Sequence, residues 1–529
     1  MSNSSPETTT LILQTLSTLV SRSGGAVELL NVEDKSPLIE LCTQQPLALD
    51  VISSAWMNAA VADSKRGLVK SSIDSIMKSL IVLFKDTDAV TLLAFVADSL
   101  TKLPSEVIPK NSSWLNGLIL LLRKLVVSRP TSAGRAAYTQ AAAALLQAFP
   151  HQTPVLLFDS KSIKKMGDDE SKPFTYLFIN LLLIDIRSAY PSLLPKLNSS
   201  EYPAISKRLS AAFDVVSSFI GFLIRSLDDE DGDFIMPPDL LLKLRKDIAE
   251  TISLTAEYLR DRFDASVAGT LGLDKDAVGG PATYGGTRKQ ITFDSIKDDI
   301  PHDQLVLASI RMLAIWLRED ENEKLREEAA GLTDLITELY MSSARNDLDF
   351  RFPILTALEA TVTTEEGIDS FIVQDTWNVL AQDLADIVKS TLRKGKQQDL
   401  ATLEARTEHD ASRGIEIIRV LLAVIDSSYG VTEPPVEWMK VVPAAAGLSA
   451  DRETSISPTC LELEIAIVQL ATALLGKASP GLRSRYRESM SALAGLMNGL
   501  RIKCKNGGGR LDDLGEAVED VIIELENLR

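Results

Sequence analysis

Apolar residues recur at helical spacing along most of the chain, and the clearest example runs from Asp303 to Tyr340. Its first half places apolar side chains on one helical face, namely Leu305, Ala308, Met312, Leu313 and Trp316. Its second half repeats the pattern with Leu325, Ala329, Leu332, Leu335, Ile336 and Leu339. Neither helix can bury its apolar stripe alone, so the pattern predicts a pair that stacks on neighbours in a helical solenoid.

The same period continues through the rest of the chain, and no strand-like alternation is sustained. It predicts helices over 8–21, 46–60, 68–84, 88–100, 113–127, 133–148, 173–189, 203–225, 238–262, 304–319, 323–341, 347–361, 368–391, 401–426, 437–447, 457–475, 480–498 and 512–528. Most of them pair through short connections, which is typical of armadillo and HEAT arrays, although no motif repeats at a fixed period. We therefore expect an all-α, armadillo/HEAT-like solenoid.

One long segment, 264–303, has no helical period and contains Gly279, Gly280, Gly285 and Gly286. A structureless stretch of this length inside a compact array is typical of a flexible or functional loop. The expected organisation is an N-terminal helical block over 1–263, this flexible insertion, and a C-terminal helical block over 304–529.

Composition supports an aliphatic helical core and an acidic surface. Hydrophobic residues make up 45% of the 529 residues, while aromatic residues make up only 5%. The 73 acidic and 55 basic residues leave a net charge of −18, which disfavours nucleic acid and anionic lipid as partners. Basic protein partners remain compatible with this charge.

Targeting signals are not evident in the sequence. Residues 1–10 are polar and lack the apolar core of a signal peptide. The best candidate for a membrane span, 114–127, is shorter than the ~20 residues required and contains Arg123 and Lys124. We expect a cytoplasmic protein without a transmembrane segment.

Phosphate and metal motifs fail on their spacing. Gly476 and Lys477 precede Ala478, where a P-loop needs Ser or Thr. The acidic run 228–233 does not match an EF-hand, because aligning Gly232 puts Leu227 and Pro238 at ligand positions. The glycines near 279–287 follow no strand and form no dinucleotide fingerprint.

Nucleophile and ligand candidates are equally sparse. Cys42 and Cys460 are expected to be buried small side chains, whereas Cys504, between Lys503 and Lys505, is a candidate exposed thiol. The three histidines, His151, His302 and His409, are too far apart for a local metal site. No catalytic, cofactor-binding or metal-binding residue is predicted.

Five tryptophans and one basic cluster complete the candidates. The tryptophans lie in apolar helical contexts and are expected in the core: Trp56, Trp114, Trp316, Trp377 and Trp438. Of these, Trp438, after Pro434 and Pro435, is the best candidate for exposure. The densest basic patch, Arg393, Lys394 and Lys396, is equally well explained as a solvated helix end.

Three helical stretches together resemble the neurochondrin family. They are Ser309–Asp320 with Lys324–Glu328, Phe178–Arg187, and Leu242–Lys246 continuing to Tyr258–Asp261. The resemblance implies an armadillo-like protein without catalytic activity that acts as a signalling adaptor for kinases, receptors and small GTPases. Animal members carry palmitoylated cysteines near the N-terminus, and positions 2–10 here contain none.

Three functions are weighed from these features. The first is a non-enzymatic scaffold or adaptor that binds protein partners along a solenoid. The second is an acidic carrier or chaperone for a basic client, which the net charge of −18 favours. The third is an all-helical enzyme with a pocket built from distant segments. Partner identity, binding face and oligomeric state are left open by the sequence.

Overall fold

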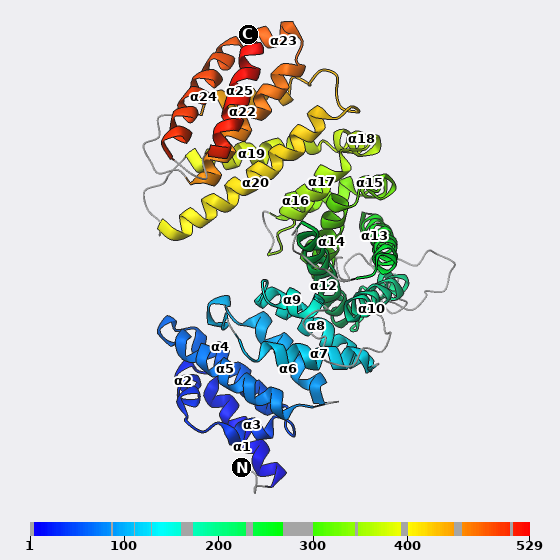
Figure 1. Ribbon diagram of the computed structural model, residues 1–529, viewed down its shortest axis with the longest axis vertical. Coiled ribbons are helices and arrows are strands. Elements are labelled where there is room, and N and C mark those ends of the chain that lie inside the picture. Colours follow the sequence, from blue (N-terminus) through cyan, green and yellow to red (C-terminus); the bar gives the residue numbers. More distant parts are fainter. Residues whose placement is uncertain are drawn as a thin grey trace, which may run out of the picture. The chain divides into compact units, whose positions relative to one another are not determined.

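A computed structural model shows an all-helical chain (Figure 1). It describes residues 5–85, 88–110, 112–128, 130–159, 173–228, 236–267, 300–343, 347–392, 400–448, 457–507 and 512–528. No strand occurs among these residues, so the expected all-α class is confirmed. Most of the expected loop, residues 268–299, lies outside the described residues.

The chain divides into two compact units, and the division falls inside one long helix, between Thr251 and Ile252. Unit 1 comprises the helices before this point and unit 2 those after it. The expected blocks 1–263 and 304–529 stay a prediction. At the described ends of the expected loop, the helix continues to Val267, and Ile300 is buried at the start of a short 3-10 helix.

Unit 1 contains twelve helices in its described residues and the first part of a thirteenth. They are α1 (Pro6–Val20), α2 (Ser23–Asn31), α3 (Ser36–Leu41), α4 (Leu47–Ala60), α5 (Arg66–Leu83), α6 (Ala89–Lys102), α7 (Leu115–Val127), α8 (Ser132–Ala148), α9 (Thr153–Phe158), α10 (Phe174–Ala189), α11 (Leu193–Lys196), α12 (Tyr202–Asp228) and α13 (Pro238–Val267). The row α4, α6, α8 and α12 packs in sequence, and α7, α9 and α10 follow one another beside it.

Unit 2 repeats this stacking with the helices from α14 onwards. They are α14 (Gln304–Glu319), α15 (Glu323–Ala330), α16 (Thr333–Ser343), α17 (Arg351–Thr361), α18 (Glu365–Val373), α19 (Thr376–Leu392), α20 (Leu400–Asp426), α21 (Val441–Ala446), α22 (Pro458–Lys477), α23 (Pro480–Ser484), α24 (Arg487–Gly507) and α25 (Asp512–Asn527). The row α14, α17, α20 and α22 packs in order, with α15, α18, α19 and α21 alongside. This arrangement fits a helical solenoid; the armadillo/HEAT-like class stays a prediction.

Several of these helices begin after a polar residue that caps their first turn. The side chains of Ser5, Thr131, Asn322, Thr364 and Ser457 each accept a hydrogen bond from a backbone amide three residues ahead. Each bond satisfies an amide that has no partner within the helix, so these caps fix where the helices begin.

Three expected helices are each broken into two, and the one expected over 480–498 divides between Ser484 and Arg487. The helix expected over 323–341 ends at Ala330 and restarts at Thr333, because Gly331, a weak helix former, caps its first part. The helix expected over 368–391 is interrupted before Thr376, where Asp375 adopts a left-handed backbone with φ of 53°. Aspartate tolerates this conformation better than most residues, so the chain can turn there.

The core of both units is aliphatic, with a few aromatic contacts. All five tryptophans are at most 7% exposed, which confirms their expected core position. Ring contacts link Trp56 to Phe95 and Trp114 to Phe149 in unit 1.

Three helical segments are long and apolar enough to cross a membrane by length and composition: Phe174–Lys196, Tyr202–Leu227 and Pro458–Lys477. They were overlooked in the sequence, because only 114–127 was considered. Within the protein, 39%, 50% and 67% of their most apolar windows are buried. The expected absence of a transmembrane segment stays a prediction.

Candidate functional site

The expected cysteine positions hold in part. Cys42 is 1% exposed, and burial raises the pKa of its thiol to about 12. Cys460 is half-buried. The expectation of an exposed thiol at Cys504 is wrong, because this residue continues the buried stripe of α24 formed by Leu493, Met497 and Leu500. Burial also raises the pKa of Cys504, so the thiolate is disfavoured there.

Trp438, the best candidate for exposure among the five tryptophans, is buried like the other four. Its side chain is 6% exposed and stacks on Trp377 with a ring separation of 3.7 Å and an interplanar angle of 8°. Pro434 and Pro435 suggested a surface loop, but the short 3-10 helix Trp438–Lys440 packs against α19.

The other sequence candidates lie either within a helix or outside the described residues. Gly476 and Lys477 are the last residues of α22, not a loop. The run 229–233, the glycines 279–287 and the cluster 393–396 lie outside the described residues. Within the described part of the chain, no group of three His, Cys, Asp or Glu side chains is arranged to hold a metal ion.

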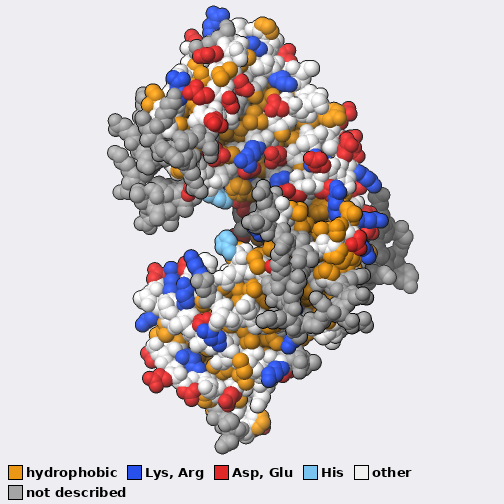
Figure 2. Space-filling view, viewed as in Figure 1, with side chains coloured by type: hydrophobic (Ala, Val, Ile, Leu, Met, Phe, Trp, Pro, Cys, Tyr) orange, Lys and Arg blue, Asp and Glu red, His pale blue; other side chains and the backbone are white. Residues whose placement is uncertain are grey.

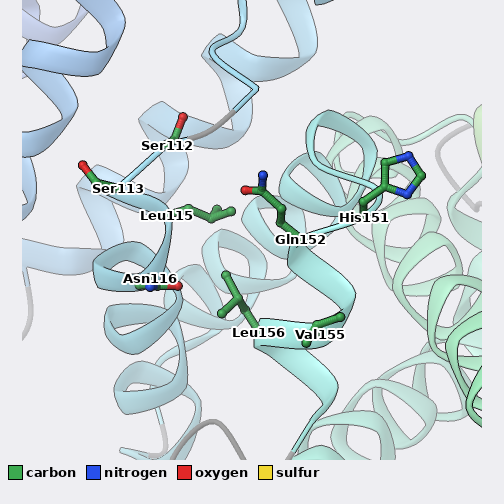
Figure 3. A pocket seen from close by; sticks show the side chains of 8 residues that line it. All are labelled: Ser112, Ser113, Leu115, Asn116, His151, Gln152, Val155 and Leu156. Atoms are coloured by element: carbon green, nitrogen blue, oxygen red, sulfur yellow. The ribbon is translucent and has the colours of Figure 1, made fainter. Parts of the chain in front are cut away.

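A groove of about 540 Å³ lies in unit 1 between α7 and α9 (Figure 3). Leu115 and Asn116 line it from α7, and Val155 and Leu156 line it from α9. Ser112, Ser113, His151 and Gln152 complete the lining, and Figure 3 shows His151 pointing away from α7. The Gln152 side-chain amide donates to the backbone carbonyl of Lys110 over 2.8 Å, which ties the start of α9 to the loop before α7.

Arg123 holds the two walls of this groove together at their C-terminal ends. Its guanidinium donates to the carbonyls of Leu156 and Leu157, at 3.1 and 2.9 Å. The guanidinium carbon, Cζ, lies 4.6 Å from the centre of the Phe174 ring. Burial lowers the pKa of Arg123 to about 10, and the charge of Asp159 opposes this shift. The side chain therefore stays charged at neutral pH and caps the carbonyls that end α9.

The groove lies in an unusually basic part of an acidic chain. Residues 98–159 contain six Lys and Arg and three acidic residues, Asp98, Glu106 and Asp159, and Asp98 pairs with Lys102. This imbalance is readable from the sequence, but it was missed because only the net charge was considered. Ser113, Asn116 and Gln152 come together only because α7 packs on α9, although α8 separates these two helices in the sequence. No local sequence motif predicts this arrangement.

Unit 2 carries the opposite charge on the surface formed by α15, α16 and α18. Between Glu319 and Asp375 the chain has fifteen acidic and four basic residues. Seven of the exposed carboxylates in this stretch that form no ion pair among the described residues lie on or beside these helices: Glu321, Glu323, Glu327, Glu338, Glu365, Glu366 and Asp369. Figure 2 shows many Asp and Glu side chains over the helices of unit 2. We call these seven residues the acidic surface.

The end of α18 adds exposed apolar side chains beside the acidic surface. Ile372 and Val373 are 42% and 78% exposed and lie one turn beyond Asp369 on the same helical face. Packing between α15 and α18 is supported by Arg326, which donates to the Thr363 hydroxyl over 3.2 Å. This surface therefore combines unneutralised charge with exposed apolar area.

A buried polar network fixes α20 against α16 and α19. Asp383 accepts hydrogen bonds from the Tyr340 hydroxyl at 2.6 Å and from Arg413 Nε at 3.0 Å. Arg413 also pairs with Asp410 at 2.9 Å and is 5% exposed. Burial, followed by the charge of Asp383, raises the pKa of Tyr340, so the hydroxyl stays protonated and acts as a donor. The network therefore links three helices, because Tyr340, Asp383 and Arg413 belong to α16, α19 and α20.

Comparison with known proteins matches residues 1–416 to neurochondrin, which is more than three quarters of the chain. The chain belongs to the neurochondrin family. The predicted resemblance is thereby confirmed, and the match includes both the groove of unit 1 and the acidic surface of unit 2. Residues 417–529 of this neurochondrin-family protein, from within α20 to the end, lie beyond the matched range.

One curated relative is an uncharacterised protein of Schizosaccharomyces pombe, C16C4.02c. It is 22% identical over 231 residues, which is 42% of this chain. The match covers 36% of the length of the fission-yeast protein.

Proposed function

We propose that this neurochondrin-family protein is a non-enzymatic scaffold or adaptor that binds protein partners along its stacked helices, in cytoplasmic signalling. The observation that carries the proposal is the acidic surface. In the free protein, water solvates exposed charges that have no ion pair, so they do not reduce its stability. When a surface of opposite charge approaches, the same charges attract it and favour it over other partners. Family membership and the stacked helices support the same role, since helix arrays present long faces for binding.

The second candidate is an acidic carrier for a basic client, and the same surface favours it. Burial raises the pKa of Glu359 on α17, and the nearby charge of Glu416 adds to this effect, as expected in a crowded acidic field. A carrier would hold its client chiefly through such charges, and salt would weaken the complex steeply. An adaptor would retain its partner through apolar contacts as well.

Affinity purification of the tagged chain at low and high salt, followed by mass spectrometry, tests both. The informative variant is the triple change Glu327→Gln, Glu338→Gln and Asp369→Asn, since all three side chains are exposed within helices. Its matched control is Glu28→Gln with Glu40→Gln, which removes exposed charge from unit 1.

An adaptor is expected to recover a stoichiometric protein partner at both salt concentrations, with recovery reduced by the triple variant but not by the control. A basic client lost in high salt and in the triple variant would instead identify a carrier. If no stoichiometric protein is recovered under either condition, both proposals fail.

A further inference from the structure

We propose that the groove between α7 and α9 binds an acidic, apolar-containing segment of a protein partner. This inference rests on the proposed protein-binding function and assigns a site and a partner chemistry to unit 1. The groove volume of about 540 Å³ falls within the ~300–1,000 Å³ of small-ligand sites, which is enough for a few side chains of an extended segment.

The lining of the groove divides into an apolar floor and a polar rim. Leu115, Val155 and Leu156 provide apolar area, and Val155 is 46% exposed with no helix covering it among the described residues. Ser113 and Asn116 are exposed at the rim, and neither side chain has a hydrogen-bond partner among the described residues. A segment with an apolar side chain on the floor and carboxylates at the rim satisfies both parts.

The local charge selects an acidic segment over a basic one. Lys110 lies beside the groove, because its carbonyl accepts a hydrogen bond from the lining residue Gln152, and its ammonium has no ion pair among the described residues. Lys124 lies two turns beyond Asn116 on the exposed face of α7 and is likewise without an ion pair there. Residues 98–159 have six basic and three acidic residues, so this part of the chain carries net positive charge and attracts carboxylates that the acidic surface repels.

Fluorescence anisotropy of the full-length chain with a labelled peptide of alternating Glu and Leu residues tests the proposal. We expect saturable binding that weakens as salt is added. A peptide of alternating Lys and Leu serves as the comparison. If it binds at all, we expect that substitutions in or beside the groove do not weaken its binding.

Two variants locate the site. Lys110→Glu reverses one charge at the groove, and Asn116→Asp adds a carboxylate with almost no change in shape. The added carboxylate would lie in the first turn of α7, where negative charge favours the helix, so folding should be preserved. Each variant should weaken binding of the Glu–Leu peptide by about tenfold.

The matched control is Lys207→Glu, which makes the same charge change at an exposed position of α12. Lys207 lies twelve residues before Phe219, the residue of α12 that contacts Phe158 of α9. This separation corresponds to about 18 Å along α12, so Lys207 is remote from this contact with α9. Binding should be nearly unchanged in this variant. The proposal is overturned if the Glu–Leu peptide does not saturate, or if Lys207→Glu weakens it as much as Lys110→Glu. Either result would leave recovery of a stoichiometric partner unaffected, so the two proposals fail separately.

Discussion

At the scale of single residues, Trp316 shows how much of unit 2 depends on one buried side chain. The residue lies in the last turns of α14 and is 7% exposed, and its neighbours Met312, Leu313 and Leu317 are also buried. α14 packs on α17, which continues the row toward α20 and α22. Loss of the ring would therefore leave a cavity at the start of this row.

Trp316→Ala should lower the free energy of unfolding by about 3–5 kcal/mol, because it removes a large buried side chain and leaves a cavity. Chemical denaturation monitored by circular dichroism measures this change. Tyr429→Ala is the control, since Tyr429 is 50% exposed and should cost much less. Equal effects of the two substitutions would show that the Trp316 ring does not support the core.

Residue-level expectations succeeded where helical period alone determines burial and failed where distant contacts determine it. The inward position of Trp316 followed from its place on an apolar stripe. Trp438 was misjudged because its stacking partner, Trp377, is 61 residues away in sequence. Cys504 was misjudged because the adjacent lysines obscured its place on the buried face of α24.

At the scale of elements, a few charged contacts hold the long helices of unit 2 in place. Arg413 and Arg419 both belong to α20, and each pairs with a carboxylate three residues earlier in the chain. Only Arg413 is buried, and only Arg413 also reaches another helix, through Asp383 of α19. The two arginines therefore form a matched comparison within one helix.

Arg413→Met should destabilise the protein by about 3 kcal/mol, because it removes the cation that balances Asp383 in a buried network. Arg419→Met should cost less than about 1 kcal/mol, since its pair with Glu416 is largely exposed. Thermal unfolding of both variants provides the test. Similar losses of stability would mean that the Asp383 network does not anchor α20.

A second contact joins α13 to α16 and predicts a pH dependence. Arg260 donates to both carboxylate oxygens of Asp334, at 2.9 and 2.6 Å. Burial by itself would raise the pKa of Asp334, but the hydrogen bonds from Arg260 and from the Leu335 amide outweigh it and lower the pKa.

The folded pKa of Asp334 is thus below its unfolded value of about 4, and the unfolded chain binds more protons at acid pH. The stability from this pair is present above pH ~4 and is lost as the pH falls through the folded pKa. Arg260→Met should flatten the acid side of a plot of melting temperature against pH, whereas Arg419→Met should not. An unchanged acid slope in Arg260→Met would rule out this linkage.

Element boundaries could be predicted where capping residues and apolar period agree, as at Asp303 and Ser457. Short helices such as α9, with six residues, span too few turns to show a period, so they were missed. The break at Asp375 was also missed, because the apolar pattern runs through it and only the backbone conformation reveals the turn. The walls of the groove in unit 1 depend on α9, so that site could not be built from sequence alone.

At the scale of the whole molecule, the charge distribution says more than the net charge of −18. The net-basic stretch 98–159 and the acidic stretch 319–375 belong to different units, so under the proposed function they would bind partners of opposite charge. Net charge alone pointed only to basic partners. The distribution along the chain instead supports an adaptor that engages more than one kind of surface, each through a separate set of helices.

Cross-linking mass spectrometry of the full chain, purified from cells with its bound partner, tests this account most directly. We expect cross-links from the partner to lysines on several stacked helices, such as Lys102 on α6 and Lys124 on α7 in unit 1, or Lys324 on α15 and Lys389 on α19 in unit 2. Purification of the chain without any stoichiometric protein, or cross-links confined to the chain's termini, would contradict a scaffold that binds partners along its helices.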